Sequence, residues 1–388
     1  MLGALGHAPF IYFLSAFPPP SIVPNPNFLR FSLMAISARI AVIGDVHGYW
    51  DLREDSKALQ LLQPDLVLFT GRFFSLYLLS CVLCFFPLPY ESVAYVHFLP
   101  HWKKACGDFG EENVELVRSI ADLKFAKAAI LGNHDAWFTP CFSQEKKDGV
   151  QLQLECLGEN HIGYRRMDFP QQKLSIVGGR PFSHGGKAMF RKQLLSARYG
   201  VKDMKASAKR IYETAIGAPE DHLVIILAHN GPTGLGSRAD DICGKDWEYG
   251  GGDWGDEDLE QAISKLKENG KFHVPPLVVF GHMHKELTYG GQRKMIVVTA
   301  DNTIYLNGAI VPRVTSYSGE EGKVGGNFTS SETSCTQSVS RGTKRAFTVV
   351  DISDGKVDKV TESWISVVGD ETSSDEANLM YQSGISKC

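Results

Sequence analysis

Five short motifs between Asp45 and His284 carry side chains of the kinds that bind metal ions. Their carboxylate, imidazole and amide groups suit cations such as Mn, Fe and Zn. Each motif alone would also fit a tight turn whose Asp caps the next helix. No structural requirement, however, explains Asp-x-His and His-x-His at opposite ends of one domain, so together they predict a two-metal hydrolytic site. The motifs are Gly44-Asp45-Val46-His47-Gly48, Gly107-Asp108, Gly132-Asn133-His134-Asp135, His229-Asn230-Gly231 and Gly281-His282-Met283-His284.

Short apolar runs precede these motifs and must position them. The runs at 39–43, 128–131, 223–227 and 277–280 are mostly Val, Ile, Leu and Ala and end near Gly, which is typical of buried strands. Side chains at the carboxyl ends of such strands form the active sites of α/β folds. The remaining pattern predicts helices at 51–62, 111–123, 201–215 and 256–269, and strands at 65–70, 175–179, 294–300, 303–308, 346–352 and 359–367.

In these motifs the chain resembles the calcineurin-like metallophosphoesterase superfamily, over roughly residues 39–310 and more weakly to about 366. The resemblance implies an α/β fold with a four-layer αββα sandwich and two divalent metal ions at the strand carboxyl ends. It implies that His134 lies beside the leaving group. Asp135, which ends the same motif, is a second catalytic candidate. The implied ligands are Asp45, His47 and His284 for the first metal, Asn133, His229 and His282 for the second, and Asp108 as the bridge between them.

Phosphate ester hydrolysis explains why these residue types are needed. Two cations roughly 3.5–4 Å apart neutralise the ester, lower the pKa of a bridging water and hold the resulting hydroxide for in-line attack. A carboxylate such as Asp108 spans both ions, and Asn133 adds a ligand without adding charge. His134 is the motif histidine not required as a ligand, so it is the candidate that protonates the leaving alkoxide. The chain is therefore predicted to be a metal-dependent phosphoric ester hydrolase.

The substrate is predicted to be small. Ser/Thr protein phosphatases continue their second motif as Asp-Arg-Gly and end their third in Glu, whereas here Phe109 follows Asp108 and the third motif ends in Asp135. This difference favours a phosphomonoester, nucleotide or phosphodiester over a phosphoprotein. Arg180 is a candidate phosphate clamp, or alternatively a salt-bridged residue of a surface turn. Asn230 is a second substrate-binding candidate, and the loop at 234–255 is either a cap over the site or a flexible loop.

Composition limits the possible partners. The chain has 388 residues, and its net charge of −4 provides no basic field for nucleic acid or an anionic membrane, which disfavours a nuclease. Its eight cysteines follow no disulfide or zinc-finger spacing, which favours free thiols in a reducing compartment. The runner-up function is a catalytically impaired or non-catalytic scaffold with the same fold. The sequence does not identify protein partners.

The ends of the chain differ from the predicted phosphoesterase domain at 39–368. Residues 1–38 contain no Asp or Glu and a single Arg, which favours a plastid transit peptide and hence a chloroplast location. The alternatives are a secretory signal, or an untranslated stretch with Met34 as the true start of a cytoplasmic protein. The Ser-, Thr- and Gly-rich stretch at 314–345 is predicted to be a mobile loop, and the tail at 369–388 to be disordered.

An apolar segment, residues 72–107, interrupts the second motif. The strand ends correctly at Gly71, but Arg72 stands where the family's Asp should follow, and Gly107-Asp108 resumes only after the segment. Removing it joins the flanks as Leu-Phe-Thr-Gly-Asp-Phe-Gly. Prolines break the segment too soon for the roughly 20 apolar residues of a membrane span. It is interpreted as a retained intervening sequence, or alternatively as a lid or membrane-surface insertion.

Deleting residues 72–107 should give a more soluble protein with higher metal occupancy and higher phosphoesterase activity. An apolar loop of this size beside the metals exposes hydrophobic surface and promotes aggregation. The measurements are the soluble fraction on expression, metal content and turnover of p-nitrophenyl phosphate. A deletion variant less active than the full chain would show that the segment is a working part of the enzyme.

Overall fold

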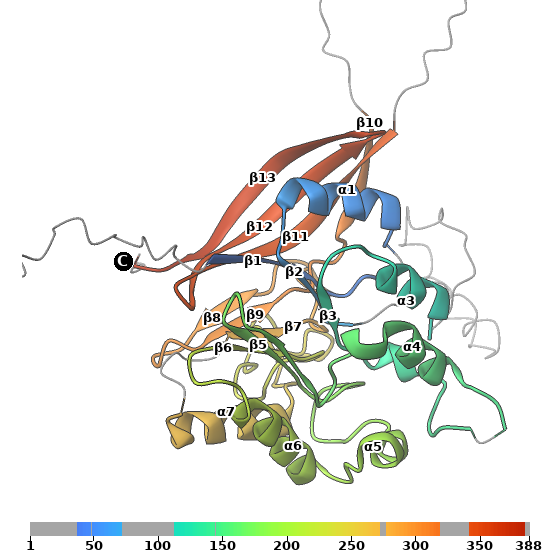
Figure 1. Ribbon diagram of the computed structural model, residues 1–388, viewed down its shortest axis with the longest axis vertical. Helices are drawn as coiled ribbons and strands as arrows, with labels where there is room; N and C mark the ends of the chain where they lie inside the picture. The colour runs from blue at the N-terminus through green and yellow to red at the C-terminus, as the bar shows by residue number, and fades with distance from the viewer. Residues whose placement is uncertain are drawn as a thin grey trace, which may run out of the picture. The chain divides into compact units, whose positions relative to one another are not determined.

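The computed structural model describes residues 37–47, 49–71, 112–143, 145–271, 277–318 and 341–384. The predicted leader, the segment at 72–107 and Asp108 lie outside the described residues, so the interpretations of them stay predictions. In the described part, two β-sheets pack face to face with helices on their outer sides (Figure 1). None of the described helices combines the length and the apolar character that a bilayer crossing requires.

The first sheet has strand order β13-β12-β11-β1-β2-β3, with β10 paired to β11. The pairs β1–β2 and β2–β3 are parallel, and the pairs on the other side of β1 are antiparallel. Parallel pairing places the ends of β1 and β3 at the same edge of the sheet. The strands are β1 (Ser37–Ile43), β2 (Leu66–Phe69), β3 (Lys127–Ala129), β10 (Val314–Ser318), β11 (Arg341–Ser353), β12 (Lys356–Val368) and β13 (Glu371–Gln382).

The second sheet has strand order β4-β5-β6-β7-β9-β8. Its four central strands are parallel, and the two outer strands pair antiparallel to their neighbours. The carboxyl ends of β6 and β7, which precede the fourth and fifth motifs, therefore share one edge. The strands are β4 (Arg166–Phe169), β5 (Leu174–Gly178), β6 (Leu223–Leu227), β7 (Leu277–Phe280), β8 (Ile296–Val298) and β9 (Ile304–Asn307).

The apolar runs fill two cores at once because side chains of a strand alternate between its faces. In β2, Leu66 and Leu68 join the core between the sheets, while Val67 and Phe69 join the core under the outer helices. A third core packs the second sheet against α6 and α7, which Figure 1 shows on that sheet's outer side. These layers confirm the four-layer αββα prediction. The helices are α1 (Leu52–Leu62), α3 (Val114–Ala121), α4 (Gly149–Leu157), α5 (Lys192–Tyr199), α6 (Met204–Ile216) and α7 (Glu257–Asn269).

Helix starts follow capping residues that can be found in the sequence. The side chain of Asp51 accepts a hydrogen bond from Glu54 N at 2.9 Å, and Asp203 does the same for Ala206 N at 2.7 Å. Such caps satisfy amide donors that have no partner inside the helix. The predicted helices at 51–62, 111–123, 201–215 and 256–269 are confirmed, whereas α4 and α5 were not predicted.

The prediction of a disordered tail is wrong for residues 371–382, which form β13. This strand pairs antiparallel with β12 from Lys359 to Val368. Most of its side chains are exposed, so it lacks the apolar alternation that marks a half-buried strand. Its order comes from backbone pairing and from ion pairs such as Lys344 Nζ–Asp375 Oδ2 at 3.0 Å, which a single segment does not show.

The predicted mobile loop at 314–345 is also wrong at both of its ends. Residues 314–318 form β10 and pair antiparallel with residues 341–345 of β11. Arg345, in this polar stretch, is 3% exposed and donates to Asp55 of α1 at 2.7 Å. A long-range ion pair with α1 thus orders a stretch whose composition predicted a mobile loop. Residues 319–340 lie outside the described part of the chain.

A buried histidine gives the fold a pH dependence. His161 is 4% exposed, its ring stacks with Phe182 at 6.5 Å, and burial together with Arg198 and Arg165 lowers its pKa to about 3. The unfolded chain has an ordinary histidine pKa of about 6.5, so it binds the proton more readily than the folded state. The stabilisation is therefore complete above that pH and is lost as the pH falls.

We expect the free energy of unfolding to fall by about 2 kcal/mol from this residue between pH 7 and pH 5. Urea unfolding at the two pH values measures the change. A His161→Gln variant, which cannot titrate, should lose about 2 kcal/mol less than the native chain across the same window. Equal losses in the two proteins would show that His161 is not the source.

Candidate metal centre

The predicted ligands come together where the two sheets meet. Asp45 and His47 follow β1, Asn133 follows β3, and His229 follows β6. His282 and His284 follow β7. Because these strands end at the neighbouring edges of two packed sheets, residues from both halves of the chain reach one place. Asp108 lies outside the described residues, so its bridging role stays a prediction.

One group in the described chain has the composition of a metal site. Asp45, His47 and His284 each offer a ligand atom, and these atoms lie within 4.8 Å of one another. The two Nε2 atoms are 2.9 Å apart, and Asp45 Oδ2 lies 3.8 Å from that of His47 and 3.4 Å from that of His284. Tetrahedral ligands at about 2.0–2.2 Å from one cation are separated by about 3.3–3.6 Å. The three separations, from 2.9 to 3.8 Å, extend to either side of this range, and the donor set suits a divalent metal.

Asn133 and His229 form the start of a second group. Asn133 Oδ1 lies 3.0 Å from His229 Nε2, and the rings of His229 and His282 are 5.0 Å apart. The other nitrogen, His229 Nδ1, lies 2.7 Å from the carbonyl oxygen of Thr70 and donates to it. With its proton on Nδ1, a neutral His229 has an acceptor lone pair on Nε2 beside the acceptor Asn133 Oδ1, an arrangement that suits two ligands of one cation. These donors suit a second cation.

A short backbone contact joins the two groups. The amide of His282 donates to Asp45 Oδ1 at 3.0 Å, which leaves Oδ2 on the side of His47 and His284. Gly281 permits this approach, because a Cβ there would lie 2.6 Å from Asp45 Oδ1. Gly132 is required in the same way, since its Cβ would lie 2.6 Å from His229 Nδ1. The glycines of the motifs thus serve close packing around the candidate ligands.

The backbone is strained at three of the candidate ligands. Asp45, His47 and His282 have φ angles of 34°, 48° and 68°. Residues with a side chain rarely adopt positive φ, and each case costs on the order of 1–3 kcal/mol. Strain of this kind gathers at binding sites, where it aims side chains that a regular strand would direct elsewhere. Asp45 and His47 belong to the first candidate group and His282 to the second, so the strain lies at candidate ligands of both groups.

His134 and Asp135 belong to a short 3-10 helix, η3 (His134–Ala136), directly after Asn133. Asp135 is buried, and its Oδ2 accepts a hydrogen bond from Gly132 N at 2.7 Å, which closes the turn. His134 is partly exposed, and its ring stacks on Trp137 with centroids 4.9 Å apart and planes 10° apart. Asp135 therefore shapes the turn that presents Asn133 and His134.

The two predicted substrate-binding residues are buried in protein contacts. Arg180 is 2% exposed and donates to Asp258 Oδ2 at 2.9 Å and to Asp256 Oδ1 at 2.7 Å. Burial raises the pKa of the Asp256 carboxyl, and the guanidinium opposes that rise. This geometry favours the salt-bridged alternative over the phosphate clamp. The ion pairs of Arg180 lie inside the protein, however, and not in a surface turn. Asn230 is buried and donates to Trp254 O at 2.8 Å, so it holds a loop in place.

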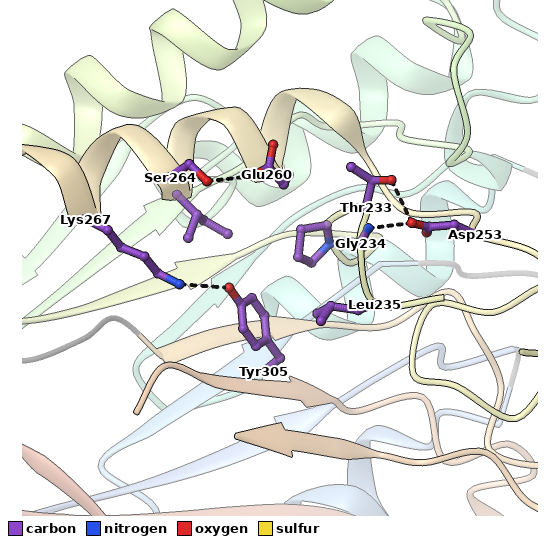
Figure 2. Close-up of a pocket in the computed structure, with 10 residues that line it drawn as sticks. Thr233, Gly234, Leu235, Asp253, Glu260, Ser264, Lys267 and Tyr305 are labelled. Atoms are coloured by element: carbon purple, nitrogen blue, oxygen red, sulfur yellow. Dashed lines mark hydrogen bonds between the residues drawn. The ribbon is translucent and has the colours of Figure 1, made fainter. Parts of the chain in front are cut away.

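A pocket of about 400 Å³ lies next to α7 and contains none of the candidate ligands (Figure 2). Its polar groups are paired with one another. Ser264 donates to Glu260 at 2.5 Å, Thr233 donates to Asp253 at 2.7 Å, and Lys267 Nζ lies 3.3 Å from the Tyr305 hydroxyl (Figure 2). The pocket is separate from the candidate metal ligands.

Comparison with known proteins identifies the family of this chain. The family model described as calcineurin-like phosphoesterase matches residues 38–286, which is more than half of the chain. The chain belongs to the calcineurin-like phosphoesterase family. The match includes all five motifs, so the candidate ligands of this chain lie within the shared region. The family is one of hydrolases that normally bind divalent metals, in agreement with the Asp45, His47 and His284 cluster.

Two solved structures are distantly similar to this chain. One is GAP50, the anchor in the inner membrane complex of Plasmodium, with 11% identity, a TM-score of 0.38, and coverage of 91% of this chain and 92% of that one. The other is a conserved protein of Streptococcus pneumoniae described as a predicted phosphoesterase, with 9% identity, a TM-score of 0.26, and coverage of 87% and 98%. No curated protein matches the chain. At these TM-scores neither structure bears on the function of this chain.

Asp45→Asn and His284→Ala should each weaken binding of the first metal by more than about 100-fold. Removing a partner of a metal ligand already costs about 10–100-fold, whereas His284→Ala removes a ligand atom and Asp45→Asn removes the negative charge of a ligand. Metal content after loading with Mn and gel filtration measures the effect. His222→Gln is the matched control, because His222 is a buried histidine that contacts Ser175 at 3.0 Å outside the cluster. Unchanged metal content in both ligand variants would contradict the assignment.

Proposed function

We propose that this chain is a dimetal-dependent phosphoesterase that hydrolyses a small phosphomonoester, nucleotide or phosphodiester. The observation that carries the proposal is the convergence of Asp45 and His47 from the first motif with His284 from the fifth, in a member of the family. The adjacent Asn133–His229 pair supports a second cation. The metals, Mn, Fe or Zn, would supply charge neutralisation for the phosphoryl group and a water of lowered pKa.

The protein residues then have separable tasks. Asp45, His47 and His284 would hold the first ion, and Asn133, His229 and His282 the second, with Asp108 as the proposed bridge. Three neutral ligands at the second ion leave it electropositive enough to hold a phosphate oxygen. Thr70 keeps His229 in the required tautomer through the 2.7 Å contact at Nδ1.

His134 is the proposed general acid. It follows Asn133 directly, so its ring lies on the turn that presents a candidate ligand. Stacking on Trp137 limits rotation of the imidazole, which keeps one nitrogen directed at the leaving group. Protonation of a departing alkoxide by a group placed in this way typically contributes about 10²–10⁴-fold in rate.

Removal of this acid should separate metal binding from chemistry. A His134→Ala variant should keep its metal content and lose about 10²–10⁴-fold in kcat on esters with alkoxide leaving groups. The loss should shrink for p-nitrophenyl phosphate, whose leaving group needs little protonation. The measurement is steady-state turnover of both substrates by metal-loaded protein, preceded by a panel of mono- and diesters that identifies the preferred alkoxide.

Outcomes of this experiment distinguish the roles. Equal losses on both kinds of ester would make His134 a structural residue. Loss of metal from the variant would instead place it among the ligands. If native protein with a full metal complement hydrolyses none of the esters in the panel, the proposed function is wrong and a non-catalytic role is favoured.

A further inference from the structure

Exposed aromatic side chains gather on the loops that carry the metal motifs. Among the described residues, the large aromatic side chains classed as exposed all follow β3, β6 or β7, the strands that precede the third, fourth and fifth motifs. Water contact of large apolar rings is unfavourable, and exposed apolar patches often mark binding sites. These exposed residues are Trp137, Phe138, Trp247, Tyr249 and Tyr289.

Two of them belong to a continuous series of rings that starts beside the candidate acid. Successive centroids lie 4.9 Å apart for His134–Trp137, 5.8 Å for Trp137–Phe190, 5.6 Å for Phe190–His184, and 5.5 Å for both His184–Trp254 and Trp254–Trp247. His184 also lies 6.3 Å from the candidate ligand His282. All of these separations are within the range of favourable aromatic pairs. We call Trp137, Phe190, His184, Trp254 and Trp247 the aromatic rim.

Hydrogen bonds hold the rim in place at its Trp137 end. Arg191 donates from Nε to Ala136 O at 2.6 Å and also donates to Trp137 O, which ties α5 to the turn after Asn133. The same guanidinium stacks over Phe190 at 4.4 Å. One cation therefore fixes two members of the rim and adds positive charge beside them.

The Trp254 end is anchored in a similar way. Its indole Nε1 donates to His184 O at 2.7 Å, and its carbonyl accepts from Asn230 Nδ2 at 2.8 Å. Gly185, at φ +83°, allows the backbone to approach this ring, since a Cβ there would lie 2.5 Å from Trp254 Cδ1. Lys245 lies 5.4 Å above the indole. Lys245 Nζ is also paired with Glu248. The rim is thus a preformed surface with the Arg191 cation against one end, which suits an anionic ligand that carries an apolar group.

We propose that the aromatic rim is a subsite that stacks a planar aromatic ring carried by the leaving group of the phosphate ester. The inference rests on the proposed function, because that function places the phosphoryl group between His282 and His134. A leaving group protonated by His134 then lies next to Trp137, whose ring is 37% exposed. Planar rings gain more from stacking on indole than puckered ones of equal size. A nucleoside and a simple aryl alcohol share this chemistry.

Matched pairs of substrates test the subsite in the metal-loaded full chain. Adenosine 5'-monophosphate and ribose 5-phosphate share one ester bond and differ in the base, while benzyl and cyclohexylmethyl phosphate differ in ring planarity. The planar member should have a kcat/KM about 10–100-fold higher, the range expected for stacking of one ring. A preference for the planar member in the nucleotide pair alone indicates a subsite for a nucleoside. A preference in both pairs indicates a subsite for any planar ring.

Variants connect that preference to the rim. Trp137→Ala should abolish the preference within a pair. Because Trp137 also restrains His134, kcat/KM of both members should fall, and the ratio of the two values is the readout. Trp137→Phe should retain most of the preference, because a ring remains to stack. Leu379→Ala is the control, since Leu379 is 54% exposed on β13 outside the metal loops, and it should change nothing. Equal kcat/KM values within both pairs in the native protein would overturn the inference while the phosphoesterase function stands.

A binding measurement keeps the test independent of turnover. Tryptophan fluorescence of Mn-loaded protein should be quenched by adenosine 5'-monophosphate and not by ribose 5-phosphate, and Trp137→Ala should raise the apparent Kd about 10-fold or more. If the protein hydrolyses nothing but shows this quenching, the proposed function fails and the subsite remains. Absence of quenching by the nucleotide at saturating concentration would sink the subsite.

Discussion

An apolar interface between the two sheets holds the carboxyl ends of β1, β3, β6 and β7 at one edge of the fold. Residues such as Ile40 and Leu68 from one sheet pack against Ile225 and Val279 from the other, all nearly without exposure to solvent. Burial of these side chains contributes about 1.5–3 kcal/mol each. That packing offsets the local cost of positive φ at Asp45, His47 and His282, because these residues sit just beyond the strands that it fixes.

Buried charge organises the loops around that edge. Arg180 joins the end of β5 to Asp256 and Asp258 at the start of α7, and Asp55 of α1 accepts from Arg345 of β11. Breaking one member of such a pair leaves an uncompensated charge inside the protein. Arg180, the candidate phosphate clamp of the sequence, therefore supports the shape of the site through buried ion pairs. Positive charge near a substrate would come from the metals and from Arg191 beside the aromatic rim.

The loops after the strands have two properties that the sequence of a single segment does not connect. They carry the candidate metal ligands, and they expose aromatic rings that a folded chain would normally bury. Hydrogen bonds from Arg191 and Trp254 hold these rings in a series that runs from His134 past His282. A phosphoryl site and an apolar subsite on one edge would select an ester by both of its parts.

Much of the chemistry was readable from residue type and local order. Apolar runs followed by Gly, Asp, Asn and His predicted strands that end in ligands, because side-chain alternation and ligand chemistry are local properties. The family resemblance and the αββα layers followed from those motifs. The polar strand β13 and the strand ends at 314–318 and 341–345 were missed, since backbone pairing and the Arg345–Asp55 ion pair are not visible in a single segment.

Only the tertiary structure decided which groups face one another. The 2.9 Å contact between His47 and His284 joins the first motif to the fifth, and composition cannot reveal such a distance. Arg180 illustrates the same limit. Its sequence context is equally compatible with a phosphate clamp and with a salt-bridged residue, and only the contacts with Asp256 and Asp258 distinguish the two. The aromatic rim draws on three separate loops. The sequence by itself determined the kinds of atoms available for catalysis, and packing of distant segments determined their arrangement.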